Sequence, residues 1–157
     1  MISIGRMAAW LSNVVTALIR RGLSISIPIR WTGYSVSKWP NFTDQEVQGL
    51  DPTFVDKLQK ARTIAGIPFR ISSGFRSPEK NQSVIGAVPD SSHLKGLAAD
   101  LRVSSSHDVA LIIDACKQAG IDRRGIYVDK SFAPVHVHVD ADPDKIADVI
   151  FIKQERN

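Results

Sequence analysis

The sequence predicts an α+β fold in which helices flank a small, mainly antiparallel sheet. Stretches with helical periodicity are mixed with short apolar stretches, without the regular strand–helix alternation of a doubly wound parallel sheet. Residues 125–128 and 135–139 both have the composition of strands and lie close enough to form one hairpin or one sheet. The chain has 157 residues, a length that suits one domain with one hydrophobic core.

The chain divides into two predicted segments. Residues 1–40 form an N-terminal helix and an irregular extension, and residues 41–157 form the folded domain. The helix is expected over residues 7–19, where apolar residues recur at helical spacing before two arginines and a glycine. We expect this helix to pack on the domain. An unusual export signal or membrane-seeking helix is the alternative, but Ser12 and Asn13 interrupt the apolar run.

The first half of the domain contains local signals for two helices and a strand. Asp51 is an N-cap residue followed by proline at the first helical position, and Gly66 is a typical helix stop. The expected elements are, in order, a helix between Asp51 and Gly66, a strand over 68–72, a helix opening at Ser77-Pro78-Glu79 and a loop over 86–92.

The second half is expected to end with a helix. The expected elements are a strand over 97–103, a helix capped by Ser106 and ended by Gly120, strands over 125–128 and 135–139, and a last helix that begins at Asp142-Pro143. In that last helix Ile146, Val149 and Ile150 would face inward. Cys116 lies on the apolar face of the preceding helix, so we expect it in the core, and a single cysteine excludes an intrachain disulfide.

The composition is that of an ordinary globular protein, with 43% hydrophobic and 23% charged residues. The net charge of +4 is spread along the chain, and no basic block or aromatic–basic motif indicates nucleic-acid binding. No apolar stretch reaches the ~18 residues that a membrane-spanning helix needs. We expect no nucleic-acid partner, no stable membrane span and a monomer.

Three residues have the side chains expected of a zinc site. His93 precedes Asp100 by seven residues in a stretch with little side-chain bulk, and His138 lies in a later strand. Imidazole and carboxylate groups are zinc ligands, and three protein ligands leave a fourth position for water. A closed structural site usually has four ligands and is rich in cysteine. It would need His136 or Asp140 as the fourth ligand here, so we expect an open catalytic site.

The last predicted strand has two chemically different faces. Side chains alternate along a strand, so His136, His138 and Asp140 project from one face, and the valines between them project from the other. This pattern predicts that metal-binding and proton-transfer groups share one face while the valines enter the core.

The order Ser-x-His-x-x-Gly-x-Ala-x-Asp, followed by His-x-His, resembles the zinc D-alanyl-D-alanine carboxypeptidases and the related phage endolysin peptidases of the L-alanyl-D-glutamate type. The matching residues are Ser91, His93, Gly96, Ala98 and Asp100, with an upstream segment Ser73-Gly74-Phe75-Arg76-Ser77 and Asn81. The resemblance covers residues 40–142. It implies the hedgehog/D-Ala-D-Ala peptidase fold and a zinc cofactor.

The resemblance also implies roles for residues outside the metal site. Arg76 would engage the substrate, and a guanidinium can bind a carboxylate of a peptide stem with two hydrogen bonds. The alternative for Arg76 is a surface salt bridge. Ser91 either orients the site and binds substrate or is an ordinary loop serine. Asn81 is either a first-turn helix residue or a substrate contact, and His107 is expected to be an exposed turn residue.

The general base is less clearly marked. Many members of the family carry an acid three residues before the last histidine, and that place is Val135 here. Asp140 is the first candidate because it shares a face with His138, followed by His136 and then Asp129. Asp140 could equally orient a ligand histidine, and His136 could instead stabilise the oxyanion.

We therefore expect a zinc metallopeptidase that cuts a peptide bond involving a D-amino acid in peptidoglycan stems, acting at the bacterial cell wall or periplasm. The enzyme is either endolysin-like, and then phage-encoded, or like a D,D-carboxypeptidase. The alternative is a non-catalytic, zinc-containing module of the same fold that binds cell wall or builds a phage structure.

Overall fold

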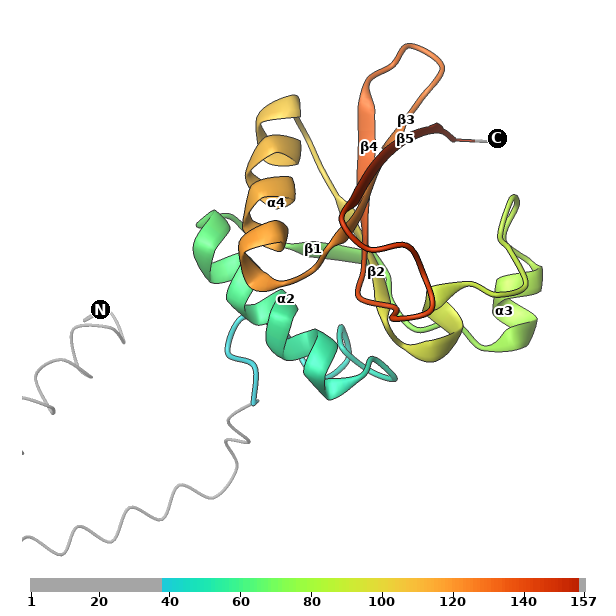
Figure 1. Cartoon of the computed structure of the whole chain (residues 1–157), viewed down its shortest axis with the longest axis horizontal. Helices are drawn as coiled ribbons and strands as arrows, with labels where there is room; N and C mark the ends of the chain where they lie inside the picture. Colours follow the sequence, from blue (N-terminus) through green and yellow to red (C-terminus); the bar gives the residue numbers. More distant parts are fainter. Residues whose placement is uncertain (1–37, 156–157) are drawn as a thin grey trace, which may run out of the picture. The chain divides into compact units, whose positions relative to one another are not determined.

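In the computed structural model, residues 38–155 are described, and they belong to one compact unit (Figure 1). The helix expected over residues 7–19, and most of the extension expected over residues 1–40, lie outside the described residues. The elements are α2 (Pro52–Ala65), β1 (Arg70–Ser73), α3 (Pro78–Gln82), the 3₁₀ helix η1 (Ser92–Lys95), β2 (Ala98–Arg102), α4 (Ser106–Ala119), β3 (Arg123–Val128), β4 (Pro134–Asp140) and β5 (Val149–Gln154).

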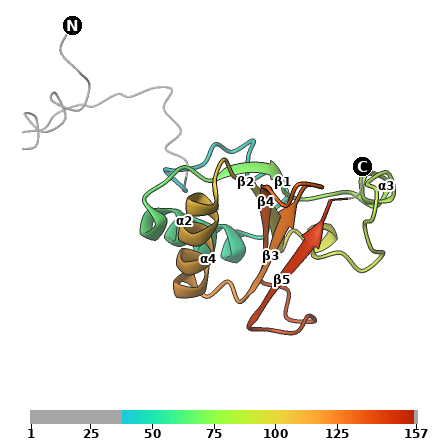
Figure 2. The same cartoon turned by 90° about the horizontal axis from the view of Figure 1, so that it is seen from above.

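The described strands form one sheet in the order β1-β2-β4-β3-β5. Neighbouring strands are antiparallel except for β3 and β5, which are parallel. Helices α2 and α4 lie side by side on one side of this sheet, and α3 lies beyond the other side (Figure 2). The predicted α+β class, with a mainly antiparallel sheet flanked by helices, is confirmed.

The two long helices begin and end where capping residues occur. Asp51 accepts hydrogen bonds from the backbone N–H groups of Thr53 and Phe54, and Gly66 ends α2 in the left-handed conformation. Helix α4 is capped by Ser105 rather than by Ser106 as predicted, because the Ser105 hydroxyl accepts the third backbone N–H of the helix.

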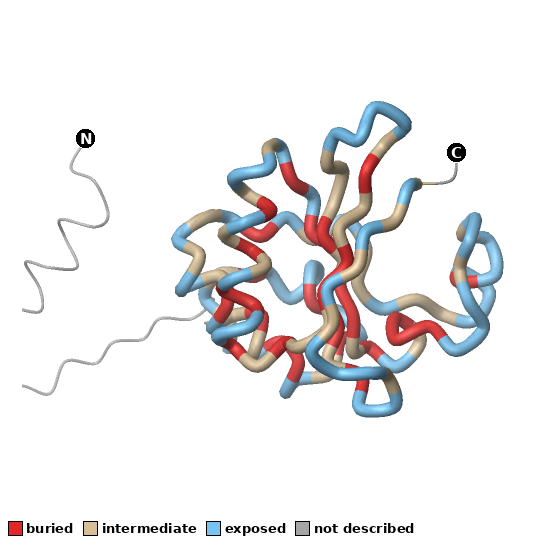
Figure 3. The backbone as a smooth tube through the Cα atoms, turned by 45° about the horizontal axis from the view of Figure 1, so that its top comes forward, coloured by how far each residue is buried: buried red, intermediate tan, exposed pale blue. Residues whose placement is uncertain are grey.

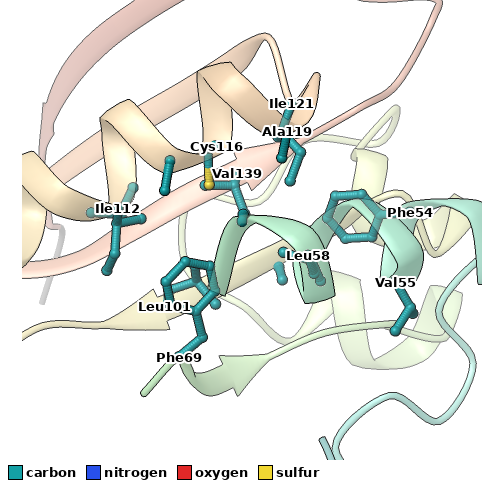
Figure 4. Packing of buried hydrophobic residues seen from close by; sticks show 14 of the residues in the cluster. Phe54, Val55, Leu58, Phe69, Leu101, Ile112, Cys116, Ala119, Ile121 and Val139 are labelled. Carbon is teal, nitrogen blue, oxygen red and sulfur yellow. The ribbon is translucent and has the colours of Figure 1, made fainter. Parts of the chain in front are cut away.

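The core lies between the sheet and the helices α2 and α4, where the buried residues of the tube gather (Figure 3). Leu58 and Phe54 of α2 belong to the same core cluster as Ile112 and Cys116 of α4, and Cys116 lies beside Val139 of the sheet (Figure 4). The prediction that Cys116 is a core residue is confirmed, since its side chain is fully buried. The core fixes the helix-facing side of β4 and leaves its opposite side for the polar residues.

The prediction of a last helix that begins at Asp142-Pro143 is wrong. Residues 149–154 form β5 instead, and Ile146 and Ile150 are exposed rather than turned inward. The Asp142 side chain accepts the backbone N–H of Asp144 and so stabilises a local turn. The same residue type caps helices, but here no helix follows it. The β-branched run that follows, Val-Ile-Phe-Ile, favours a strand, and β3 offers it a pairing edge.

Candidate metal centre

The three expected metal ligands meet at the junction of η1, β2 and β4. Asp100 and His138 are direct partners across the antiparallel pair β2/β4, and His93 lies in η1, just before β2. The Asp100 Oδ1 atom is 2.9 Å from His138 Nδ1 and 3.3 Å from His93 Nε2. One ligand atom from each residue lies within 4.8 Å of the others, as ligands of a single ion would.

The remaining ring nitrogens of both histidines are bonded to protein oxygens. His93 Nδ1 lies 2.6 Å from the carbonyl oxygen of Gly74, and His138 Nε2 lies 3.0 Å from Asp140 Oδ2. Each outer nitrogen can thus donate its N–H to an oxygen, which leaves the inner nitrogen with a lone pair for a metal. This donor set of two imidazoles and one carboxylate fits zinc and provides one open position.

Backbone packing holds the η1 turn close to its neighbours. Ser91 caps η1 by accepting the backbone N–H of His93. Gly96 ends the turn at a φ of +69°, and a Cβ there would lie 2.5 Å from the carbonyl oxygen of Gly49. This close approach explains why glycine occupies the middle of the histidine–aspartate motif.

The electrostatics of the cluster favour an ionised carboxylate beside histidine. Burial would raise the pKa of Asp100, but hydrogen bonds from His138 and His93 outweigh it and hold that pKa below its ordinary range. Burial would lower the pKa of His138, but hydrogen bonds to Asp100 and Asp140 outweigh burial and raise it. The buried Asp100 carboxylate thus lies between two histidine rings, in a place where a cation would be attracted.

Arg76 contacts the carboxylate of Asp100. Its Nη2 lies 2.6 Å from Asp100 Oδ2, and its Nε donates to Ser73 Oγ at 2.8 Å. The Arg76 side chain is only 12% exposed, so this pair does not match the surface salt bridge considered as the alternative. The backbone N–H of Arg76 also donates to the carbonyl of His93, which ties the arginine loop to η1.

Asp140 is buried and already bonded on both oxygens. Oδ2 lies near His138 Nε2 and 3.2 Å from the Nε of Arg123, while Oδ1 accepts the backbone N–H of Asp142. The side chain is 1% exposed. These contacts fit a residue that orients His138, the second of the two roles considered for Asp140.

His136 shares the polar face of β4 but makes different contacts. Its Nε2 lies 3.9 Å from Asp100 Oδ1, and its Nδ1 lies 3.0 Å from Glu155 Oε1. Its ring stacks on Tyr127 with a centroid separation of 4.3 Å. Burial lowers the pKa of His136, even though Asp100 and Glu155 act against this shift.

A cavity of about 610 Å³ opens over the cluster. One wall is the loop over residues 83–88, and the other is the site-facing side of β5, which presents Phe151 and Lys153. Ser91 lines the cavity as well. The candidate ligand cluster thus lines an open cleft with one largely apolar wall, formed by residues 83–88, and one wall that carries charged residues.

The other sequence candidates lie elsewhere. Asn81 and Asp129 are not among the described residues that line the cavity. Asn81 is buried and donates to the carbonyl of Val88, which holds the cavity loop. Asp129 accepts two backbone N–H groups in the β3–β4 turn, and His107 is exposed at the start of α4, as expected.

Sequence reasoning missed the contribution of β3 and β5. Arg123, Gly125 and Tyr127 are the register partners of Asp140, His138 and His136 in the β3/β4 pair. A Cβ on Gly125 would lie 2.3 Å from the Phe151 ring, so glycine lets that ring reach the site. The alternating positions of Arg123, Gly125 and Tyr127 along one strand could have indicated that they share a face. The contact with β5 leaves no local signal in the sequence.

Comparison with known proteins gives a family match. The model of the family described as Peptidase M15 matches residues 34–140, which include the whole ligand cluster. Among solved structures, the chain is similar to the L-Ala D-Glu endopeptidase ChiX of Serratia marcescens. The two share 18% identity with a TM-score of 0.45, over 68% of this chain and 96% of that chain. Among curated proteins, none matches the chain.

Proposed function

Because the chain belongs to the peptidase M15 family, we propose that it is a zinc-dependent enzyme that hydrolyses a peptide bond involving a D-amino acid in peptidoglycan stems. The family membership confirms the metallopeptidase that the sequence predicts. The zinc ion and the D-amino-acid substrate are the proposed parts. The peptidase domain would extend over residues 41–157, with residues 1–40 as a separate extension.

One observation carries the proposal for zinc. The inner nitrogens of His93 and His138 face the same carboxylate oxygen of Asp100, while their outer nitrogens are bonded to protein oxygens. Histidines that only pack in a core would not be expected to direct two ring nitrogens at one oxygen of a buried carboxylate. When bound, zinc supplies Lewis acidity toward a peptide carbonyl and makes water nucleophilic near neutral pH.

The surrounding residues would bind and orient the substrate and move its protons. The guanidinium of Arg76 has five N–H donors, of which the bonds to Ser73 and Asp100 use two. The others suit a carboxylate of the stem peptide or the developing oxyanion. Asp140 holds His138 in place, and His136 is then the candidate for proton transfer.

The site of action follows from the substrate. We propose that the enzyme acts as a monomer on cell-wall peptide stems in the periplasm or outside the cell. Within residues 38–155, no helix is both long and apolar enough to cross a bilayer.

Digestion of purified peptidoglycan tests the proposal. The zinc-loaded protein should release fragments, detected by mass spectrometry of the muropeptides, and a chelator should stop the release until zinc is restored. The masses also show whether a terminal residue or an internal bond is cut. Matched synthetic stems with D- or L-residues at the cleaved bond should differ strongly in rate. Equal cleavage of both stereoisomers would contradict the D-amino-acid assignment.

A further inference from the structure

His136 is held in one orientation by two neighbours. Tyr127 stacks on its ring at 4.3 Å with an interplanar angle of 18°, and Glu155 Oε1 lies 3.0 Å from its Nδ1. The opposite ring nitrogen, Nε2, is turned toward Asp100 at 3.9 Å. The His136 side chain lines the cavity and is 16% exposed, so Nε2 lies where a substrate can reach it.

The position of Glu155 is set by the sheet. Strand β5 runs parallel to β3, and the backbone N–H of Glu155 donates to the carbonyl of Val128 at 2.8 Å, which continues the pairing past the end of β5. Tyr127, one residue before Val128, is the register partner of His136 across β3/β4. The same sheet order therefore brings the carboxylate to the histidine that the neighbouring strand presents.

At position 135 of β4 the sequence has valine, so this position supplies no acid to the site. Asp140 is bonded to His138 and Arg123 and is almost fully buried. The cavity-facing imidazole of His136 has Asp100 at 3.9 Å from Nε2 and Glu155 at 3.0 Å from Nδ1.

We infer that Glu155 is a positioning residue that, through its contact with Nδ1, holds the His136 ring so that Nε2 faces the reacting groups. The inference rests on the proposed function. The hydrogen bond at one ring nitrogen determines which nitrogen carries the proton, and an acid that orients a histidine base is a recurring arrangement in hydrolases. Glu155, the residue directly after β5, thus supplies the carboxylate at Nδ1 of His136.

The proton balance is simple. Nε2 of His136 accepts one proton from the attacking water as its oxygen bonds to the carbonyl carbon. The same proton passes to the leaving nitrogen as the C–N bond breaks, so the products are a carboxylic acid and an amine. Glu155 keeps its hydrogen bond to Nδ1 and exchanges no proton. The pair returns to its starting state after each turnover.

The kinetic test compares Glu155→Gln with Glu79→Gln, a control at an exposed glutamate in the first turn of α3. Glu155→Gln should lower kcat by about tenfold to a thousandfold, with KM and zinc content little changed. Glu155→Asp should recover part of the loss. In a His136→Ala background, Glu155→Gln should have no further effect on kcat, because Glu155 acts only through the His136 ring. An unchanged kcat, or losses that add in the double variant, would overturn the inference.

A second measurement does not depend on activity. Nitrogen-15 NMR of the zinc-loaded protein reports which ring nitrogen of His136 carries the proton. We expect Nδ1–H in the wild type and a shift of the proton toward Nε2 in Glu155→Ala. The same tautomer in both proteins would overturn the positioning role even if the enzyme is active. A wild-type protein with the expected tautomer that releases no fragments would instead overturn the proposed function.

Discussion

Replacement of Asp140 by asparagine separates the two roles that this acid can have. Asp140 accepts the Nε2–H of His138 and contacts Arg123, and asparagine keeps its shape but not its charge. A buried hydrogen bond to a charged group contributes about 1.5–3 kcal/mol, against about 1 kcal/mol for a neutral one. The difference of about 0.5–2 kcal/mol corresponds to about a twofold to thirtyfold loss of zinc affinity. The lost charge pair with Arg123 adds to it, so the total should approach the roughly tenfold to hundredfold loss typical for partners of ligand histidines.

The assay is a competition for zinc between the protein and a chromophoric chelator. Asp129→Asn is the matched control, because the side chain of this aspartate accepts its hydrogen bonds from Ser131 and Ala133 within the β3–β4 turn. It should leave the zinc affinity unchanged. If Asp140→Asn binds zinc as tightly as the wild type but no longer cleaves, the orienting role is wrong and Asp140 is the general base.

Three further predictions follow from single contacts. Arg76→Lys should lower cleavage by about tenfold to a thousandfold, and Arg70→Lys, at an exposed position on β1, should not, as measured by initial rates on stem peptides. Gly96→Ala should lower the melting temperature more than Gly66→Ala. Both glycines have a positive φ, but only a Cβ at Gly96 would lie 2.5 Å from a backbone oxygen, so equal shifts in melting temperature would refute the clash. Burial raises the pKa of Cys116 to about 12, so at pH 8 the thiol should stay protonated and react with a disulfide reagent only after unfolding.

The sequence predicts those parts of the fold that local chemistry determines. The N-cap at Asp51 and the glycine at position 66 are sufficient to place α2, and the alternation of valine with polar residues is sufficient to orient β4. The same alternation indicates that His136 and His138 share a face. Each of these features depends on residues within one or two turns of each other.

The sequence predictions that failed concern features that depend on pairing between distant segments. The capping signal at Asp142 suggested a helix, whereas the chain makes a turn there and pairs residues 149–154 with β3. This error also hid Glu155, which reaches His136 only because β5 lies beside β3. The contact of Arg76 with Asp100 joins two motifs 24 residues apart, and neither motif alone indicates it.

Zinc content measured by elemental analysis tests the central claim most directly. The wild type should bind one zinc per chain after extensive dialysis. His138→Ala should fall well below one, because it removes a ligand while the helix-facing valines of β4 keep the core intact. His107→Ala, at an exposed histidine outside the cluster, should retain the wild-type content. Full zinc occupancy in His138→Ala would contradict the assignment of His93, Asp100 and His138 as the metal centre.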